Sequence, residues 1–427
     1  MRRRFLVAAG VAILLAGAAA AYYLTKDRFG GDVLGSSSGF VPTQTVPVEP
    51  PSAGSGLVSP MFGDVPERVH VGVGHVRPPF RLAWKAAGTS LIEFPPALAF
   101  NRLYYATLSG DFIAISTRTG RRLWTRHVGR CEAAEPAVSE YRGGTVFETF
   151  LNRQPSCRTG VNNPGDGLLL AIAAGRPNTL RWKRNLGASE TSPLIVGKRL
   201  YIGTAQGNVY CLHANSGKTI WRYHVGAPVK GAIAYDRGKV FFGAYDGHLY
   251  ALGAAGGKLV WTASSARDWT GGSGRFYSTP AVAYSRVYVG STDGKVYAFD
   301  ERTGKLAWAK GTGGYVYASP AVYNRRVFIG SYSHVFYALD AATGRAIWTF
   351  KADGRISGSA TVVAGLVYFP SLGAPGLRRT YALNARTGKK IWFWRDGGFG
   401  SVVTDGSKLY LVGWGKIYAF ERRQRRH

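Results

Sequence analysis

Residues 337–348 read Tyr-Ala-Leu-Asp-Ala-Ala-Thr-Gly-Arg-Ala-Ile-Trp, and close copies of this stretch recur along the chain. The copy before it runs from Tyr297 through Thr303-Gly304-Lys305 to Trp308. Each copy follows a small-Pro-Ala segment and an aromatic or β-branched run that ends in Gly. Self-similarity at a period of about forty residues is the signature of a repeat fold. The short aromatic and β-branched runs between Gly-rich turns predict strands.

Landmark residues of the repeat count its copies. A small residue between apolar neighbours recurs eight times, from Ala114 to Ala419, each time on a predicted strand. This series is offset from the series of tryptophans. No small-residue strand precedes Trp84, and no tryptophan strand follows Ala419. We therefore predict an all-β, eight-bladed β-propeller whose last blade is shared between the chain ends, because a closed ring leaves no long open edge. The repeat tryptophans are Trp84, Trp124, Trp182, Trp221, Trp261, Trp308, Trp348 and Trp392.

This pattern resembles the pyrroloquinoline-quinone-type (PQQ) β-propeller repeat over roughly residues 81–421, and residues 337–348 keep the motif nearly intact. The family includes the propeller scaffold of the bacterial outer-membrane protein assembly machine and the propellers of quinoprotein dehydrogenases. The resemblance implies that Ala298, Gly304, Trp308 and their repeat mates are structural. Each tryptophan is then expected to dock against the next blade.

The N-terminus carries a candidate membrane anchor. The stub at residues 1–4 contains three arginines, and the apolar run at residues 5–24 is long enough, at about 1.5 Å per residue, to cross a bilayer. The charge bias places the N-terminus in the cytoplasm and the propeller outside it. A cleaved signal peptide is the alternative, since Ala18-Ala19-Ala20 offers small residues to a peptidase. Both alternatives predict an extracytoplasmic protein.

The remaining boundaries follow from composition. Residues 25–60 are rich in Gly, Ser and Pro and are expected to form a flexible linker. The propeller is expected at residues 61–421, and residues 422–427 form a basic tail. The 427 residues carry 54 Lys and Arg against 24 Asp and Glu, a net charge of +30, which attracts polyanions. Outside the cytoplasm the abundant polyanions are lipid headgroups and cell-wall or surface polymers, so no nucleic acid partner is expected.

Three cysteines exclude a disulfide scaffold and a zinc module built on cysteine pairs. Cys211 takes the small-residue position of its strand and is expected to be buried. Cys131 lies in an inter-blade loop, and Cys157 lies in the long hairpin at residues 150–167. Those two loop types rise from the same face of a propeller. We therefore predict a disulfide between Cys131 and Cys157 if the protein is exported.

Catalytic motifs are weak in this sequence. The Gly35-x-Ser37-x-Gly39 match to a nucleophile elbow lies in the linker and not on a strand-to-helix turn. The family resemblance offers PQQ with calcium as a cofactor, but no carboxylate, amide and aspartate trio maps onto this chain. The two adjacent cysteines found in many such enzymes are also missing. No cofactor and no metal site is expected, and no catalytic residue is assigned.

Acidic residues precede the first strands of three consecutive blades, at Glu93, Glu135 and Glu190. First strands line the channel, so these side chains can meet there, with Lys230 and Arg355 expected opposite them. Two interpretations stay open for this set. The residues form a polar channel site, or they are strand-end acids that pair with the surplus of Arg and Lys.

Three insertions lie on the face that carries the predicted disulfide, at residues 150–167, 264–276 and 370–379. Long loops on a rigid scaffold commonly carry recognition. Trp269 belongs to no repeat position, so it is either an exposed anchor or a residue folded over its own blade. The candidate partner-binding residues on this face are Arg153, Arg158, Trp269, Arg275, Arg378 and Arg379.

These observations favour a non-catalytic, membrane-anchored, extracytoplasmic propeller, expected to be monomeric. It would bind an envelope protein, an anionic polymer or lipid headgroups. The absence of a lipidation cysteine near the N-terminus and the strong positive charge depart from the outer-membrane scaffold. A PQQ-dependent dehydrogenase and the sensor head of a membrane complex are the alternatives.

Overall fold

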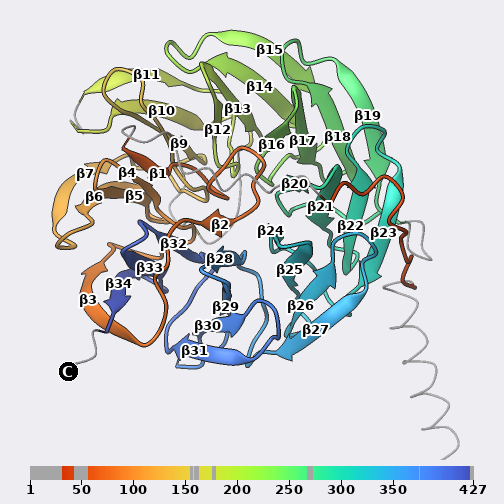
Figure 1. The fold of residues 1–427 in the computed structure, drawn as a ribbon. Helices are drawn as coiled ribbons and strands as arrows, with labels where there is room; N and C mark the ends of the chain where they lie inside the picture. The colour runs from red at the N-terminus through yellow and green to blue at the C-terminus, as the bar shows by residue number, and fades with distance from the viewer. Residues whose placement is uncertain are drawn as a thin grey trace, which may run out of the picture.

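The computed structural model describes residues 31–42, 56–153, 157, 163–175, 179–266, 273–374 and 376–423. Their strands form eight sheets arranged radially around a central channel (Figure 1). Each sheet is a blade of four antiparallel strands, and blades 1 and 7 each gain a fifth, inner strand from the N-terminal segment. The predicted all-β, eight-bladed propeller is confirmed.

The first four blades follow each other in chain order, and each runs from the channel outward. Blade 1 contains β4 (Ala97–Ala99), β5 (Arg102–Ala106), β6 (Asp111–Ser116) and β7 (Arg122–His127). Blade 2 contains β8 (Ala137–Ser139), β9 (Thr145–Phe150), β10 (Leu168–Ala173) and β11 (Leu180–Arg184). Blade 3 contains β12 (Leu194–Val196), β13 (Arg199–Gly203), β14 (Asn208–His213) and β15 (Thr219–His224). Blade 4 contains β16 (Ala234–Asp236), β17 (Lys239–Gly243), β18 (His248–Gly253) and β19 (Leu259–Ser264).

The next three blades repeat this pattern. Blade 5 contains β20 (Ala281–Ala283), β21 (Arg286–Gly290), β22 (Lys295–Asp300) and β23 (Leu306–Gly311). Blade 6 contains β24 (Ala321–Tyr323), β25 (Arg326–Gly330), β26 (Val335–Asp340) and β27 (Ala346–Lys351). Blade 7 contains β28 (Thr361–Val363), β29 (Leu366–Ser371), β30 (Arg379–Asn384) and β31 (Lys390–Trp394).

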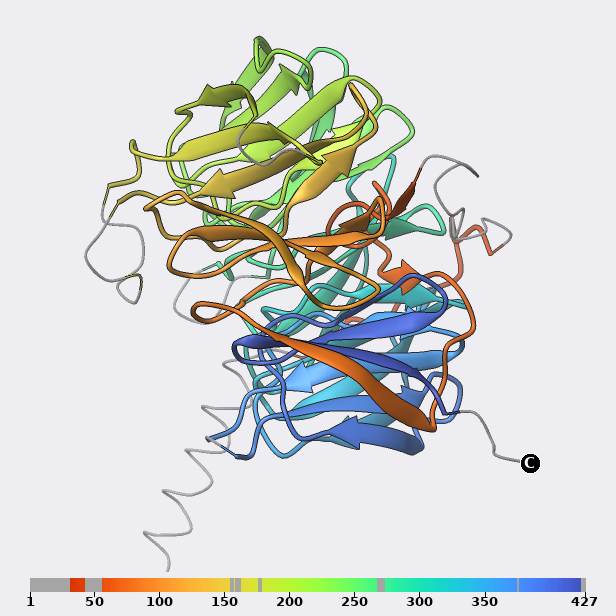
Figure 2. The same cartoon turned by 90° about the vertical axis from the view of Figure 1, so that its left-hand side faces the viewer.

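Blade 8 closes the ring with strands from both ends of the propeller. It contains β32 (Val402–Thr404), β33 (Lys408–Val412) and β34 (Lys416–Arg422), and its outer strand is β3 (Phe80–Ala87). β3 lies antiparallel beside β34 with Trp84 opposite Ala419 (Figure 2). This pairing confirms the predicted shared blade and satisfies the backbone groups that an open ring would expose.

The tryptophans tie each blade to its successor. The Trp308 indole N–H donates to the carbonyl oxygen of Ala341 at 3.0 Å, and its ring covers Gly344 in the Thr-Gly turn of blade 6. Trp84, Trp182, Trp221, Trp261 and Trp348 make the same indole-to-carbonyl bond to the next blade. Within the described residues the Trp124 indole nitrogen has no acceptor. Trp392 packs on Phe80 and Phe420 of blade 8.

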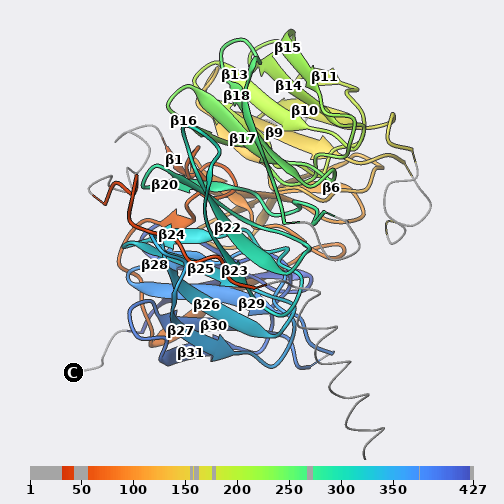
Figure 3. The ribbon, with the colours of Figure 1, turned by 90° about the vertical axis from the view of Figure 1, so that its right-hand side faces the viewer.

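The predicted linker at residues 25–60 is wrong where the structure describes it. Val33 pairs through its backbone with Ala309 at the open edge of β23, and the Asp32 carboxylate contacts Lys310 at 2.5 Å. Gly35 lies against Trp308 so closely that a side chain there would meet the Ala307 carbonyl oxygen at 2.7 Å. The segment therefore attaches to the outer edge of blade 5 (Figure 3). An unpaired strand edge captures this polar segment.

Other expectations about the ends reach beyond the described residues. The candidate anchor at residues 5–24 lies outside them, and no helix in the described ranges is long and apolar enough to span a membrane. The expected basic tail begins later than predicted, because Arg422 is the last residue of β34. Residues 424–427 lie outside the description.

Three alanine substitutions measure what the tryptophan docking requires of the facing glycine. At Gly344, with φ +76°, a new Cβ would lie 2.7 Å from a Trp308 ring carbon, so we expect Gly344→Ala to lower the free energy of unfolding by about 3 kcal/mol. Gly365→Ala tests the effect of positive φ alone, because no heavy atom would lie within 4 Å of the new Cβ. It should lower the free energy of unfolding by about 1 kcal/mol. Gly256→Ala has neither feature and should change stability by less than about 0.5 kcal/mol.

Chemical denaturation of the three variants gives the comparison. Equal losses for Gly344→Ala and Gly365→Ala would show that contact with the tryptophan ring contributes nothing beyond backbone strain.

Candidate functional site

The chain's own N-terminal segment crosses the central channel. β1 (Leu57–Ser59) adds to blade 1, β2 (Val71–Gly72) adds to blade 7, and Gly74 bridges to Gly406 in blade 8 (Figure 1). Residues 57–74 are called the plug below. Sequence reasoning placed residues 61–80 before the repeats and did not foresee that they enter the channel. Inner-strand N–H groups of blades 2, 4, 5, 6 and 7 donate to the carbonyl oxygens of Pro60, Pro66, Glu67, Val69 and His70 at 2.7–2.9 Å.

Arg68 holds the plug from the centre. Its side chain is fully buried, and its guanidinium donates to the carbonyl oxygens of Ile233 at 2.9 Å, Pro193 at 3.2 Å, Ser192 at 3.3 Å and Phe62. Burial lowers the pKa of Arg68 to about 10, so the group stays charged at neutral pH. Five N–H donors in a planar fork suit such a set of carbonyl acceptors, and a lysine cannot reproduce it.

A cavity of about 70 Å³ lies between the plug and the inter-blade loops. Glu93, Glu135, Glu190 and Lys230, four of the five residues predicted for the channel, line it together. Arg355 does not join them. It is exposed, and its guanidinium lies 5.6 Å from the ring centre of Tyr332.

Lys230 neutralises one acid of the cavity and lies beside it. Its ammonium is 2.7 Å from the Glu190 carboxylate, which also accepts a hydrogen bond from the Tyr277 hydroxyl at 3.4 Å. We expected Lys230 to lie across the channel from the acids. This is wrong for Glu190, which Lys230 contacts directly. The two residues come from the entry loops of adjacent blades, so their side chains are neighbours around the ring.

The other carboxyl groups of the cavity hold their protons more tightly than in water. Burial raises the pKa of Glu93 to about 7, with a smaller contribution from Glu190. Burial raises the pKa of Asp64 to about 6, partly offset by a hydrogen bond from the Ser59 hydroxyl at 2.5 Å. Burial and the nearby Asp64 raise the pKa of Glu135 well above its usual range, against the opposing charge of Arg68.

Two more buried acids and a histidine surround this group, and sequence reasoning missed their role. Glu132 and Glu148 in blade 2 are buried, and burial raises the pKa of each well above its usual range. Glu148 stands in β9, whose six residues are all buried, and a charged residue in such an apolar strand was the available signal. Burial and the Arg68 charge lower the pKa of His70 to about 3, so its ring is neutral.

A collar of hydroxyl groups fixes the loops that frame the cavity. The hydroxyl oxygen of Ser192 accepts the backbone N–H of Glu135 from the preceding blade at 2.8 Å. Thr279, Ser319 and Ser359 repeat this contact around the ring at 2.9–3.0 Å. These residues occupy the small position of the small-Pro-Ala motif or its equivalent, so the repeat itself builds a rigid frame.

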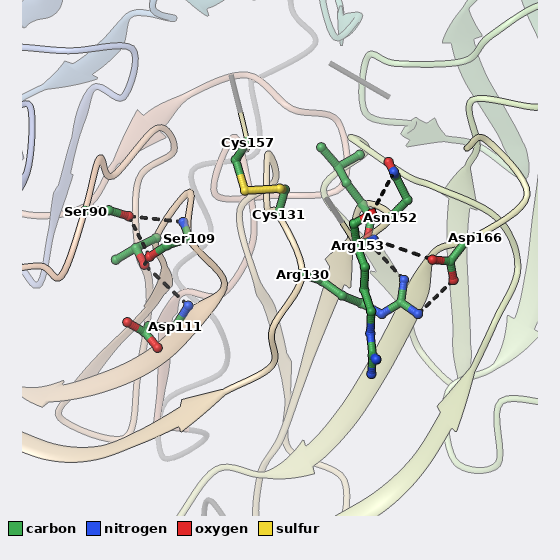
Figure 4. The surroundings of a disulfide bond; sticks show 11 residues. Ser90, Ser109, Asp111, Arg130, Cys131, Asn152, Arg153, Cys157 and Asp166 are labelled. Carbon is green, nitrogen blue, oxygen red and sulfur yellow. Dashed lines mark hydrogen bonds and ion pairs between the residues drawn. A yellow bond between two sulfur atoms is a disulfide. The ribbon is translucent and has the colours of Figure 1, made fainter. Parts of the chain in front are cut away.

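The insertion-bearing face is stabilised near blade 2 by covalent and ionic contacts. Cys131 and Cys157 form a disulfide with a Cα–Cα distance of 5.4 Å (Figure 4). Arg130 pairs with Asp166 at 2.7 Å, and Asp166 also accepts the backbone N–H of Arg153 at 3.5 Å. The Arg153 residue is exposed.

Three of the predicted arginines on this face have side chains held by a ring or an ion pair. The Arg275 guanidinium lies 5.3 Å from the Tyr245 ring centre, and that of Arg378 lies 3.6 Å from the Trp414 ring centre. Arg379 pairs with Asp353 at 2.7 Å. Sequence reasoning did not single out Trp414. Arg158 and Trp269 lie outside the described residues.

Comparison with known proteins assigns the family. Residues 165–314 and 294–425 match the family described as outer membrane protein assembly factor BamB. The chain belongs to this family. Among solved structures, BamB from Moraxella catarrhalis is 19% identical with a TM-score of 0.64, covering 80% of this chain and 99% of that one.

Two other proteins resemble this BamB-family chain, one in its solved structure and one in its sequence. The quinohemoprotein alcohol dehydrogenase ADHIIG from Pseudomonas putida HK5 is 15% identical with a TM-score of 0.70, covering 87% of this chain and 82% of that one. Tetrathionate hydrolase from Acidithiobacillus ferrooxidans is 25% identical over 38% of this chain and 43% of its own length. The chain thus spans less than half of that curated relative. At these identities the solved structures establish the fold alone.

Two features of the cavity bear on whether it could hold a quinone cofactor with a metal ion. The described part of this BamB-family chain holds no group of three or more His, Cys, Asp or Glu residues placed to bind a metal ion. The cavity volume of about 70 Å³ is also small compared with the roughly 300–1,000 Å³ that is typical of sites for drug-sized ligands. The plug residues Phe62, Asp64 and His70 occupy part of the channel.

Replacing Arg68 should release the plug. Arg68→Met removes the donors to four buried carbonyl oxygens, so we expect a loss of about 3–5 kcal/mol in the free energy of unfolding. Arg77→Met, at an exposed position, is the matched control and should stay within about 0.5 kcal/mol of wild type. Urea denaturation measures both. Similar stabilities would contradict a structural role for the Arg68 contacts.

Glu93 should make stability depend on pH in a defined direction. Its pKa is raised in the folded state. Its contribution to the free energy of unfolding is therefore fully present below about pH 4.5 and is lost as the pH rises through about 7. Glu93→Gln cannot lose stability in this way. We expect the free energy of unfolding of the variant, relative to that of wild type, to rise by about 2 kcal/mol between pH 5 and pH 8. Glu140→Gln, at an exposed position, should show no such trend. Denaturation at several pH values tests this, and a pH-independent difference would contradict it.

Proposed function

We propose that this chain is a non-catalytic, extracytoplasmic propeller, anchored to a membrane by residues 5–24, that binds an acidic envelope protein through its insertion-bearing face. The observation that carries the proposal is the set of arginines held on that face by aromatic rings and ion pairs. Arg275 lies over Tyr245, Arg378 lies over Trp414, and Arg379 pairs with Asp353.

Held side chains favour recognition because little rotamer freedom is lost when a partner binds. Arginine and large aromatic residues also dominate the binding energy of protein interfaces. The net charge of +30 selects acidic partners and accelerates their encounter at low salt. The family description, an outer membrane protein assembly factor, supports a protein as the partner.

The second candidate, a PQQ-dependent dehydrogenase, rests on the shared fold of the alcohol dehydrogenase neighbour. The small cavity and the plug weigh against it. Incubating the protein with PQQ and calcium tests it, by cofactor absorbance and by dye-linked oxidation of alcohols and sugars. Turnover would replace the scaffold proposal.

A pair of charge-matched variants tests the scaffold proposal. Arg153→Gln, Arg275→Gln and Arg378→Gln together remove three charges from the insertion-bearing face. Arg118→Gln, Arg345→Gln and Arg386→Gln remove three from exposed turns between third and fourth strands, which lie on the other face. Capture from envelope extracts at low and high salt, followed by affinity measurement with the captured protein, compares them. We expect the first variant to lose about tenfold or more in affinity and the second to bind like wild type.

Equal losses in the two variants would indicate that net charge alone attracts the partner, which contradicts a specific face. Capture of a polysaccharide in place of a protein would support the polymer alternative instead. No enrichment at either salt concentration would overturn both.

A further inference from the structure

Three acids that line the channel cavity form no ion pair within the described residues. Asp64 of the plug, Glu93 of blade 1 and Glu135 of blade 2 all line the cavity, and no described Lys or Arg forms an ion pair with any of them. Arg68 faces Glu135, but its guanidinium donates to backbone carbonyls. Lys230 forms its ion pair with Glu190.

Two buried polar atoms on this side lack a partner in the described structure. Glu135 is 2% exposed and its Oε1 accepts no hydrogen bond, and His70 is 4% exposed with an unpartnered Nε2. Both residues line the cavity. A buried polar atom without a partner costs free energy, so a ligand that donates hydrogen bonds would be stabilised here.

Aromatic rings complete the walls of the cavity. Phe62, Phe94, Tyr277, Tyr317 and Phe399 line it, with Phe62 and Phe94 in an edge contact at 6.3 Å and Tyr277 and Tyr317 at 5.4 Å. Carboxyl groups beside aromatic faces suit an organic cation, because its charge favours their ionised form and it then gains both ion pairing and cation–π attraction. An inorganic ion is disfavoured, because no three carboxyl or imidazole groups of the described chain converge on one point.

We infer that the cavity between the plug and the inter-blade loops binds an organic monocation, a primary ammonium or guanidinium group, with Asp64, Glu93 and Glu135 as its acceptors. A volume of about 70 Å³ holds such a group on a short alkyl stem. The inference does not require the proposed function. The group can belong to a free small amine or to a lysine or arginine side chain of a bound protein.

Calorimetric titration of the full-length protein tests the inference. Methylguanidinium is the probe, and methylurea, which has nearly the same shape and no charge, is its control. We expect methylguanidinium to bind with a dissociation constant below about 1 mM and methylurea to give no binding heat. Glu135→Gln and Glu93→Gln should each weaken binding tenfold or more, whereas Glu140→Gln, at an exposed site, should bind like wild type.

Thermal unfolding gives an independent readout and checks that each variant is folded. Methylguanidinium should raise the melting temperature of wild type and of Glu140→Gln but not of Glu135→Gln. Equal binding to all variants, equal binding of methylurea, or calcium binding that these glutamine variants abolish would overturn the inference. So would the absence of binding by wild type.

A blocked tripeptide with a central arginine distinguishes the two sources. Binding of the peptide supports a protein side chain, and binding of methylguanidinium alone supports a free small amine. The arginine variants of the insertion-bearing face leave these carboxyl groups intact. Loss of partner binding in those variants and loss of cation binding here are therefore separate results.

Discussion

Packing of a tryptophan on the glycine of the next blade's turn is the contact on which the ring depends. A four-stranded blade cannot bury both of its faces alone, and its neighbours supply the missing surface. The indole ring fills the space above a glycine, and its N–H satisfies a carbonyl of the same turn, as Trp308 does with Gly344 and Ala341. One side chain thus joins apolar burial and a hydrogen bond at the interfaces of six of the eight repeat tryptophans. Blade 8 needs a strand from each chain end to present Trp84 to blade 1.

Closure of the ring leaves a channel, and the plug fills one part of it with backbone. Inner strands have a free edge that faces the channel, and the plug offers its carbonyl groups to the N–H groups of five blades in turn. Arg68 then satisfies carbonyls that face the centre. A charged group is stable there because a ring of strand entries converges many backbone acceptors on one point. The plug therefore acts as a ninth structural element and reduces the channel to a small cavity.

The charge distribution of the molecule is uneven in a way that bears on binding. The chain as a whole is strongly basic, yet the cavity gathers Asp64, Glu93, Glu135 and Glu190, with Glu132 and Glu148 buried close behind. Burial raises the pKa of Glu93, Glu135 and Glu148, which favours their neutral forms and so limits their mutual repulsion. The cavity is lined by inter-blade loops, the same class of loop that carries Arg275.

The repeat alone determined the blade count and the shared closing strand, because Trp, Gly and small residues recur at positions that only one packing geometry explains. It also brought Glu93, Glu135, Glu190 and Lys230 to the channel, since each precedes a first strand. The sequence of residues 57–74 did not predict that they enter the channel. Their contacts are backbone hydrogen bonds to distant strands, and such bonds leave no periodic pattern in the sequence. The attachment of residues 31–42 to β23 escaped prediction for the same reason. Arg355 and Lys230 show what the repeat position alone cannot predict. It places both residues at the channel mouth, but the packed neighbours decide whether each side chain turns inward.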